Sequence, residues 1–137
     1  MGIRRFLKLG LDPVDLAAQL LGVMAMRLVD QLCPFCKIPE TRQEHQAWVD
    51  EAFAQPGVLN LYQRNAGGCV NCHYVGYRGR FAIYELLLAT SAVQEMIIAG
   101  GSESQLREAG IPKGRSLMDS AKRSLWGGAI GVDELLR

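Results

Sequence analysis

The chain has 137 residues, of which 49% are hydrophobic and 21% are charged, as is usual for a globular protein with a core. Its 15 basic and 14 acidic residues leave a formal net charge of +1, so overall charge does not drive it toward nucleic acid. No apolar run reaches the roughly 18 residues of a membrane helix, and Lys8 and Asp12 interrupt the segment after the basic N-terminus, which argues against a signal peptide.

The first 32 residues are predicted to be helical. Residues 3–9 can form a short amphipathic helix that stops at Gly10. Asp12 as an N-cap and Pro13 at the first helical position begin a second helix. Apolar residues then recur at spacings of three and four, which predicts one long buried helix that runs directly into Cys33: Leu16, Leu20, Val23, Met24, Leu28 and Leu32.

The segment between residues 37 and 68 is predicted to be an arm with one helix. Thr41 and Glu44 have the spacing of a capping box, and Pro56-Gly57 supplies a turn that ends the helix. Apolar side chains gather on one face of it: Trp48, Val49, Ala52 and Phe53. Residues 58–62 are predicted to form a short strand, and residues 65–68 a loop that leads to Cys69.

The last third of the chain is predicted to be one strand followed by helices. Residues 81–87 have the composition of a mostly buried strand. Three helices should begin at Ser91, Ser102 and Ser116 and stop near Gly100, Gly110 and Gly127, with a last turn over residues 132–136. The predicted fold is mainly α with a small β component, divided into a helical segment 1–32, a metal-binding lobe 33–79 and a strand-plus-helix subdomain 80–137.

All four cysteines fall into two C-x-x-C units, Cys33–Cys36 and Cys69–Cys72, with 32 residues between them. A C-x-x-C turn can direct two thiolates at one point, so two such turns supply the four ligands of a tetrahedral ion. Zinc is the usual ion in an all-sulfur site. The sequence therefore predicts that Cys33, Cys36, Cys69 and Cys72 bind one Zn²⁺, and that this zinc is structural because no position is left for water.

Two other interpretations of the cysteines are open. Cys69 and Cys72 with His73 match the C-x-x-C-H signature of covalent haem attachment, but this leaves Cys33 and Cys36 unexplained and requires export. The cysteines can also be interpreted as disulfide-forming or redox-active, although neither C-x-x-C unit clearly lies between a strand and a helix as in redox motifs. With four thiols present, His45 and His73 are predicted not to be ligands.

A basic and aromatic cluster follows the second C-x-x-C unit and comprises Tyr74, Tyr77, Arg78 and Arg80. Such a cluster can bind nucleic acid or an acidic protein surface. It can also form a collar of positive charge, because a zinc ion held by four thiolates carries a net double negative charge. The collar is the favoured interpretation.

The sequence contains no recognisable catalytic or nucleotide-binding motif. The segment from Gly110 to Ser116 is rich in glycine and lysine, but its spacing is wrong for a phosphate loop and Pro112 removes an amide donor. A nucleophile elbow, an H-E-x-x-H motif and an obvious carboxylate pair are also missing. We therefore predict no catalytic residues and no nucleotide-binding residues in this chain.

Several motifs in a fixed order resemble a known family. They are the runs at residues 10–13, 20–23 and 27–29, the knuckle at residues 32–36, the runs at residues 68–72, 76–80 and 83–87, and the C-terminal runs at residues 114–119 and 133–136. In this order they are similar to the region after the nucleotide-binding core of type II secretion and type IV pilus assembly ATPases. Two departures are Phe81-Ala82, where the family usually has threonine- or valine-glycine, and Ile111-Pro112-Lys113 before the terminal helices.

The resemblance implies a parent protein that is a hexameric ATPase at the cytoplasmic face of the inner membrane, held there through partners. It also implies that ATP and Mg²⁺ bind in the parent, whose phosphate loop precedes the matched region, so the chain is expected to be a C-terminal, non-catalytic piece. The implied partners are the other subunits of the hexamer and membrane platform proteins, with no nucleic acid. The alternative is an independent zinc-ribbon-like module that binds nucleic acid or protein.

Overall fold

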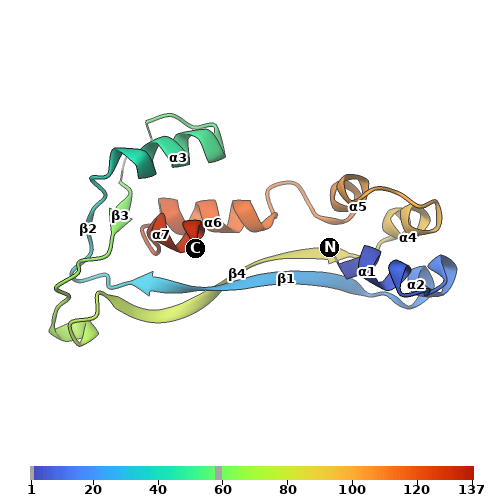
Figure 1. The fold of residues 1–137 in the computed structure, drawn as a ribbon, viewed down its shortest axis with the longest axis horizontal. Coiled ribbons are helices and arrows are strands. Elements are labelled where there is room, and N and C mark those ends of the chain that lie inside the picture. Colours follow the sequence, from blue (N-terminus) through green and yellow to red (C-terminus); the bar gives the residue numbers. More distant parts are fainter. Residues whose placement is uncertain (1, 58–59) are drawn as a thin grey trace. The chain divides into compact units, whose positions relative to one another are not determined.

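The structure is a computed structural model, and it describes residues 2–57 and 60–137 (Figure 1). Two compact units can be distinguished, each built from two separate stretches of chain. The first unit comprises Met1–Met26 and Tyr84–Leu117, and the second comprises Arg27–Ile83 and Met118–Arg137. Strands β1 (Gly22–Leu32) and β4 (Tyr77–Leu88) pair in one two-stranded sheet, and β2 (Ile38–Pro39) and β3 (Tyr62–Gln63) pair in another. As predicted, helices predominate and the β component is small.

The prediction of a long helix up to Leu32 is wrong, because residues 22–32 form strand β1. Helix α2 (Pro13–Gln19) does begin as predicted, with Asp12 Oδ1 accepting from the amides of Val14 and Asp15 at 2.8 and 3.3 Å. It ends at Leu20, whose backbone is extended. Between Gly22 and Val29, apolar residues occupy both even and odd positions, so a helical and a strand periodicity fit equally well. Pairing with β4 decides between them.

The first unit packs helices around one apolar cluster. It contains α1 (Gly2–Lys8), α2, α4 (Ser91–Ile98) and α5 (Glu103–Gly110). The cluster consists of buried side chains from these helices and from β4: Ile3, Ala17, Leu87, Val93, Ile97 and Leu106. The predicted helices at Ser91 and Ser102 are confirmed. Ser102 and Gln105 form a reciprocal capping box, whereas Thr90 rather than Ser91 caps α4.

Glu85 on β4 forms hydrogen bonds with two segments of the first unit, α5 and the residue at the start of the last long helix. Its carboxylate receives two bonds from the Arg107 guanidinium, at 2.6 and 2.8 Å, and one from the amide of Leu117 at 2.8 Å. The hydrogen bonds from Arg107, followed by the one from Leu117, lower the pKa of Glu85 although desolvation opposes them. A buried carboxylate therefore holds α5 and the start of the last long helix to the strand.

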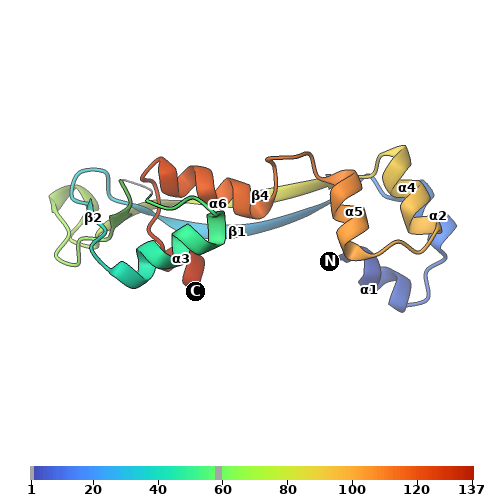
Figure 2. The same cartoon turned by 90° about the horizontal axis from the view of Figure 1, so that it is seen from above.

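The second unit contains α3 (Gln43–Phe53), a short 3₁₀ turn η1 (Val70–Cys72), α6 (Leu117–Trp126) from Met118 onward, and α7 (Asp133–Leu136). Strands β2 and β3 are antiparallel, with Ile38 opposite Gln63 and Pro39 opposite Tyr62, and they connect the cysteine turns to α3 (Figures 1 and 2). The helix predicted from Ser116 to near Gly127 is confirmed as α6, and the last turn predicted over residues 132–136 is confirmed as α7. The strand predicted over residues 58–62 falls partly outside the described residues, and β3 lies at its C-terminal end.

The helix predicted after Thr41 is present, but its capping box is not. Arg42 occupies the N-cap position and no side chain caps the helix. Thr41 Oγ1 instead accepts from Gln63 Nε2 at 3.3 Å across the β2–β3 ribbon. The helix is fixed by packing at its other end, where Phe53 makes edge-on ring contacts with Trp48 and with Trp126 of α6, at centroid distances of 6.1 and 5.3 Å.

Among the described residues, no helix combines the length and the apolar character needed to cross a membrane.

Candidate metal centre

The first cysteine turn follows directly from β1. Cys33 is fully buried, and its amide donates to the carbonyl of Gly76 in the second turn at 3.0 Å. The amide of Lys37 donates back to Cys33 O at 3.0 Å and closes the turn around Cys36. Because the Cys33–Gly76 bond joins segments 43 residues apart in sequence, the backbone already brings the two turns together.

The second turn is a tight loop that depends on two glycines. A Cβ at Gly68 would lie 2.3 Å from the carbonyl carbon of Tyr74, and one at Gly76 would lie 2.4 Å from Asn65 O. Both glycines have positive φ, at 60° and 85°. The chain between them coils as η1, and Tyr74 N donates to Cys69 O at 2.8 Å. His73 and Tyr74 both adopt the left-handed conformation, which costs non-glycine residues about 1–3 kcal/mol each.

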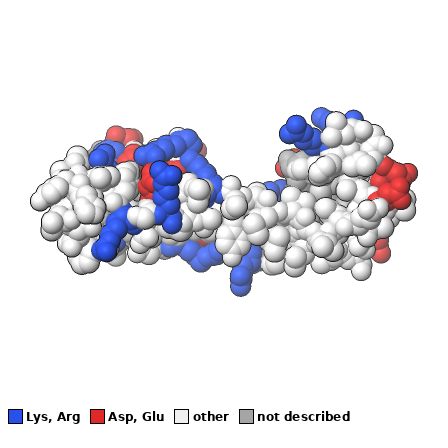
Figure 3. Space-filling model, turned by 90° about the horizontal axis from the view of Figure 1, so that it is seen from below, with Lys and Arg blue, Asp and Glu red and all other residues white. Residues whose placement is uncertain are grey.

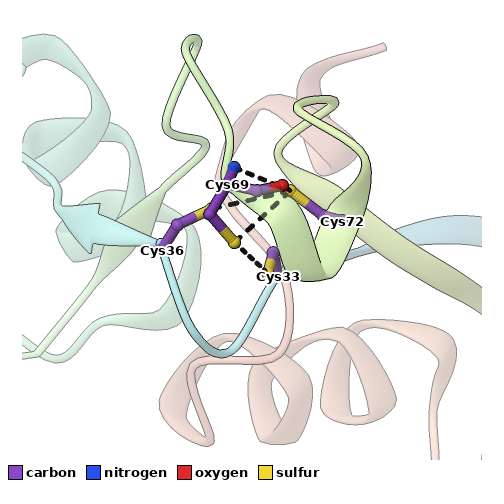
Figure 4. Close-up of side chains that lie close together, drawn as sticks. All are labelled: Cys33, Cys36, Cys69 and Cys72. Atoms are coloured by element: carbon purple, nitrogen blue, oxygen red, sulfur yellow. Dashed lines mark hydrogen bonds between the residues drawn. The ribbon is translucent and has the colours of Figure 1, made fainter.

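The four sulfur atoms converge on one point between the turns (Figure 4). All lie within 4.8 Å of one another, and the pairs Cys33–Cys69, Cys36–Cys72 and Cys69–Cys72 are each separated by 3.8 Å. Zinc–thiolate bonds of about 2.3 Å in a tetrahedron place the sulfurs about 3.8 Å apart. The donor set and its spacing therefore fit a four-coordinate zinc ion, and all four cysteines are free of disulfides.

Backbone amides favour charge at one of these sulfurs. Cys72 Sγ accepts from the amides of Cys69 and Gly76, both at 3.2 Å. Although desolvation acts in the opposite direction, these two bonds lower the pKa of Cys72 to about 6. Desolvation and hydrogen bonds with the other three thiols raise the pKa of Cys36 to about 12. Four neighbouring thiolates cannot all be charged without a compensating cation, and a divalent ion supplies that charge.

Comparison with known proteins identifies the family of this chain. The family model described as type II/IV secretion system protein matches residues 1–137. The chain belongs to this family. It is 36% identical over 136 residues to type II secretion system protein E of Pseudomonas aeruginosa and 35% identical over 136 residues to type II secretion system ATPase E of Vibrio cholerae. It is also 34% identical over 137 residues to the type IV pilus assembly ATPase PilB of Myxococcus xanthus.

The region matched is a fraction of each of these secretion relatives. The alignments cover 98% of this chain but only 26%, 26% and 24% of the Pseudomonas, Vibrio and Myxococcus proteins. The chain therefore spans about a quarter of the length of the curated relatives that it matches. The resemblance drawn from the sequence motifs is confirmed at the level of the family.

In this member of the type II/IV secretion family, the histidines lie apart from the thiol cluster. His45 is buried, and its Nδ1 lies 3.0 Å from Glu40 Oε2. His73 is exposed and forms the C-cap of η1. The convergence of all four thiols favours one four-ligand ion over a haem, which would leave the first pair of cysteines without a role.

The arginines predicted to form a collar around the thiols make contacts with other side chains of the second unit. Arg80 Nε pairs with Asp30 at 2.8 Å, and the guanidinium of Arg78 lies 5.5 Å from the ring centroid of Phe35. Arg64, which was not part of the predicted cluster, donates to Val75 O at 2.7 Å and lies over the ring of Tyr77. None of these three arginines donates a hydrogen bond to a sulfur; the close donors are the amides described above.

Sequence reasoning missed an ion cluster that links the arm to the C-terminal helix. Arg42 donates to both carboxylate oxygens of Glu40 at 2.9 Å and to Asp133 at 2.9 and 3.2 Å. His45 lies between the same two carboxylates. Glu40 and Arg42 are adjacent enough to suggest a pair, but no local pattern points to Asp133, which is 91 residues from Arg42.

Proposed function

We propose that the chain is the zinc-binding C-terminal module of a hexameric ATPase that powers type II protein secretion or type IV pilus assembly, and that it is not catalytic by itself. The observation that carries the metal assignment is the convergence of four sulfurs with separations of 3.8 Å. The family match over the full 137 residues supports the assignment to the secretion machinery. The parent is proposed to bind ATP and Mg²⁺ outside the matched motifs, because the sequence lacks a phosphate loop.

In this proposal, Cys33, Cys36, Cys69 and Cys72 hold the zinc, which crosslinks the two cysteine turns and takes part in no reaction. A backbone hydrogen bond also connects the turns. The Cys33–Gly76 backbone bond holds the two turns in register, and the amides of Cys69 and Gly76 stabilise the charge on Cys72. The metal and these bonds thereby hold together the two cysteine turns, which lie at the two ends of the arm within the lobe over residues 33–79.

We further propose that this lobe docks or couples the ATPase to its partners, which are the other subunits of the hexamer and platform proteins at the inner membrane. The arm is suited to this role because it is held firmly at both ends. The zinc turns hold its base, while the Phe53–Trp126 contact and the Arg42–Asp133 pair hold α3. A purely stabilising role for the zinc is the competing explanation.

The metal assignment is tested by elemental analysis and absorption spectroscopy of the purified chain. One zinc per chain and no haem Soret band are expected. A chain without zinc, or with a Soret band, would contradict the assignment. The proposal of a non-catalytic module is tested separately: ATP hydrolysis that persists through purification and responds to a point substitution within these residues would refute it.

The docking role is tested in the full-length parent with changes confined to the exposed side of α3. Glu44→Lys and Glu51→Lys reverse two exposed charges and leave the Arg42 cluster intact. Loss of secretion or pilus assembly, with zinc content and ATP hydrolysis retained, is expected. Normal secretion or assembly in these variants and in further charge reversals along the arm would mean that the zinc only stabilises the fold. Salt-sensitive binding of nucleic acid by the isolated chain would favour the independent zinc module instead.

A further inference from the structure

The two cysteine turns carry apolar side chains that point away from the core. Phe35, Val70 and Tyr74 expose 64%, 69% and 67% of their surface, and Val75 exposes 48%. Phe35 lies within the first turn, Val70 in η1, and Tyr74 and Val75 directly after η1. We call these four residues the knuckle tip. Tyr74 has a left-handed backbone conformation that non-glycine residues seldom adopt.

The two stretches of chain that carry the knuckle tip contain basic residues and no acidic ones. Residues 31–39 contain no Asp or Glu, and neither do the 33 residues from Ala52 to Tyr84. The acidic residues that border the first stretch are already neutralised. Asp30 pairs with Arg80, and the side chain of Glu40, only 2% exposed, pairs with Arg42. In Figure 3 the atoms at the far left are all uncharged, and both Lys or Arg and Asp or Glu side chains lie to their right.

Two arginines border the tip and have no carboxylate partner in the part of the chain that the structure describes. Arg78 lies over the exposed Phe35 ring, and Arg64 donates to the carbonyl of Val75. Arg78 is thus held beside a side chain of the knuckle tip, and Arg64 beside the backbone of another tip residue. Exposed rings and aliphatic groups with cations at their rim are the composition of a surface that enters the headgroup region of an anionic bilayer.

We propose that the knuckle tip is a membrane-contact surface, which inserts Phe35 and Tyr74 among the headgroups of an anionic lipid bilayer while Arg64 and Arg78 contact lipid phosphates. The inference rests on the proposed zinc-bound lobe, because the metal holds the two turns together. It adds a direct lipid contact to the partner-mediated attachment proposed above.

Two other kinds of occupant fit the tip less well. A specific protein interface buries about 800 Å² on each partner, and four side chains on two short turns offer much less. Single-stranded nucleic acid binds to aromatic platforms on which successive bases stack, whereas two of the four tip side chains are valines. A bilayer does not require a complementary shape, so a small apolar tip with a basic rim is sufficient.

The test is co-sedimentation of the zinc-loaded 137-residue chain with vesicles. Binding to mixed phosphatidylcholine–phosphatidylglycerol vesicles and not to pure phosphatidylcholine vesicles is expected, and it should weaken as salt is raised. The double substitution Phe35→Ser/Tyr74→Ser should lower the partition coefficient by about tenfold or more. Arg78→Glu should lower it by about fivefold or more.

Matched controls change exposed residues in the first unit. Leu21→Ser removes an apolar side chain that is 89% exposed, and Lys113→Glu reverses an exposed charge. Both should bind within about twofold of the wild type. A wild type that binds neither kind of vesicle, a double variant that binds like the wild type, or controls that lose as much binding as the tip variants would each overturn the proposal.

A second measurement does not depend on the stability of the tip variants. Phe35→Trp places a reporter at the tip, and anionic vesicles with brominated acyl chains should quench its fluorescence. Absence of quenching in a zinc-loaded protein, or displacement of the vesicles by a single-stranded oligonucleotide that binds more tightly, would contradict the membrane assignment. Zinc content is measured on the same samples. A chain that takes up no zinc would refute the metal proposal, and a chain that holds zinc but binds no vesicles would refute the membrane proposal alone.

Discussion

Alanine substitution of Gly76, in the second cysteine turn, is predicted to destabilise the fold more than alanine substitution of Gly79, in the adjacent strand β4. Gly76 and Gly79 both have positive φ, at 85° and 84°. A Cβ at Gly76 would meet Asn65 O at 2.4 Å and Arg64 Cγ at 2.7 Å, whereas a Cβ at Gly79 meets nothing within 4 Å. Substituting each by alanine therefore forces an alanine to positive φ at both positions, but adds a steric clash only at Gly76.

The expected magnitudes follow from these contacts. Placing alanine in the left-handed region costs about 1–2 kcal/mol, and the reduced entropy of the unfolded chain returns about 0.4–1 kcal/mol of this. Gly79→Ala should therefore lower the free energy of unfolding by about 1 kcal/mol. Gly76→Ala adds an overpacking cost of about 1–3 kcal/mol, since a backbone oxygen cannot rotate away, so we expect a total loss of about 2–4 kcal/mol.

Gly76→Ala should also weaken zinc binding, because Gly76 O accepts from Cys33 N and Gly76 N donates to Cys72 Sγ. Any displacement of this backbone separates the two turns. The assay is urea unfolding of the zinc-loaded chain followed by tryptophan fluorescence, since both tryptophans, Trp48 and Trp126, lie in the second unit. Competition with a chromophoric chelator gives the zinc affinity. Equal unfolding midpoints and equal zinc affinities for the two variants would refute the steric argument.

Three further predictions follow from the other contacts. Glu40→Gln should lower the free energy of unfolding, measured by urea titration at pH 7, by about 2 kcal/mol. Desolvation raises the pKa of Glu40, but hydrogen bonds from Arg42 and His45 outweigh it and hold this pKa at about 2. The loss is smaller than the whole pKa shift would give, because Arg42 is partly exposed to solvent. Glu44→Gln, an exposed neighbour, should change it by less than about 0.5 kcal/mol, and equal effects of the two would contradict this. Glu85 has a lowered pKa in the folded chain, so it stabilises the fold above the ordinary glutamate pKa, and this stabilisation is lost as pH falls through the lower folded pKa. Glu85→Gln should therefore make the free energy of unfolding depend less on pH in the acid range. Parallel stability–pH curves for the variant and the wild type would contradict this. Cys72→Ser should abolish zinc binding and unfold the cysteine turns, while His73→Ala should keep the zinc, as elemental analysis and fluorescence will show; zinc retained in the first or lost in the second would overturn the ligand assignment.

Some features of this protein were determined by the sequence itself, because the signals that encode them are local. The spacing within each C-x-x-C unit predicts a turn that directs two thiols to one side, and the structure brings all four sulfurs together. The Ser102–Gln105 capping box and the Asp12–Pro13 helix start are formed by hydrogen bonds over two or three residues, and both are confirmed. The motif order was also sufficient to identify the family.

Other features were decided only by the tertiary structure, because they depend on segments far apart in the chain. Residues 22–29 fit a helix as well as a strand, and pairing with β4, which begins 45 residues after β1 ends, makes them a strand. Thr41 was expected to cap the arm helix, but Arg42 occupies the N-cap position and its side chain pairs with the buried Glu40 and with Asp133, 91 residues away. Arg78 follows the second cysteine turn in sequence, but the ring that it lies over is Phe35 of the first turn, more than 40 residues away. Helix caps and cysteine turns are satisfied within a few residues, whereas strand pairing and ion pairs require the partner that only the folded chain brings near.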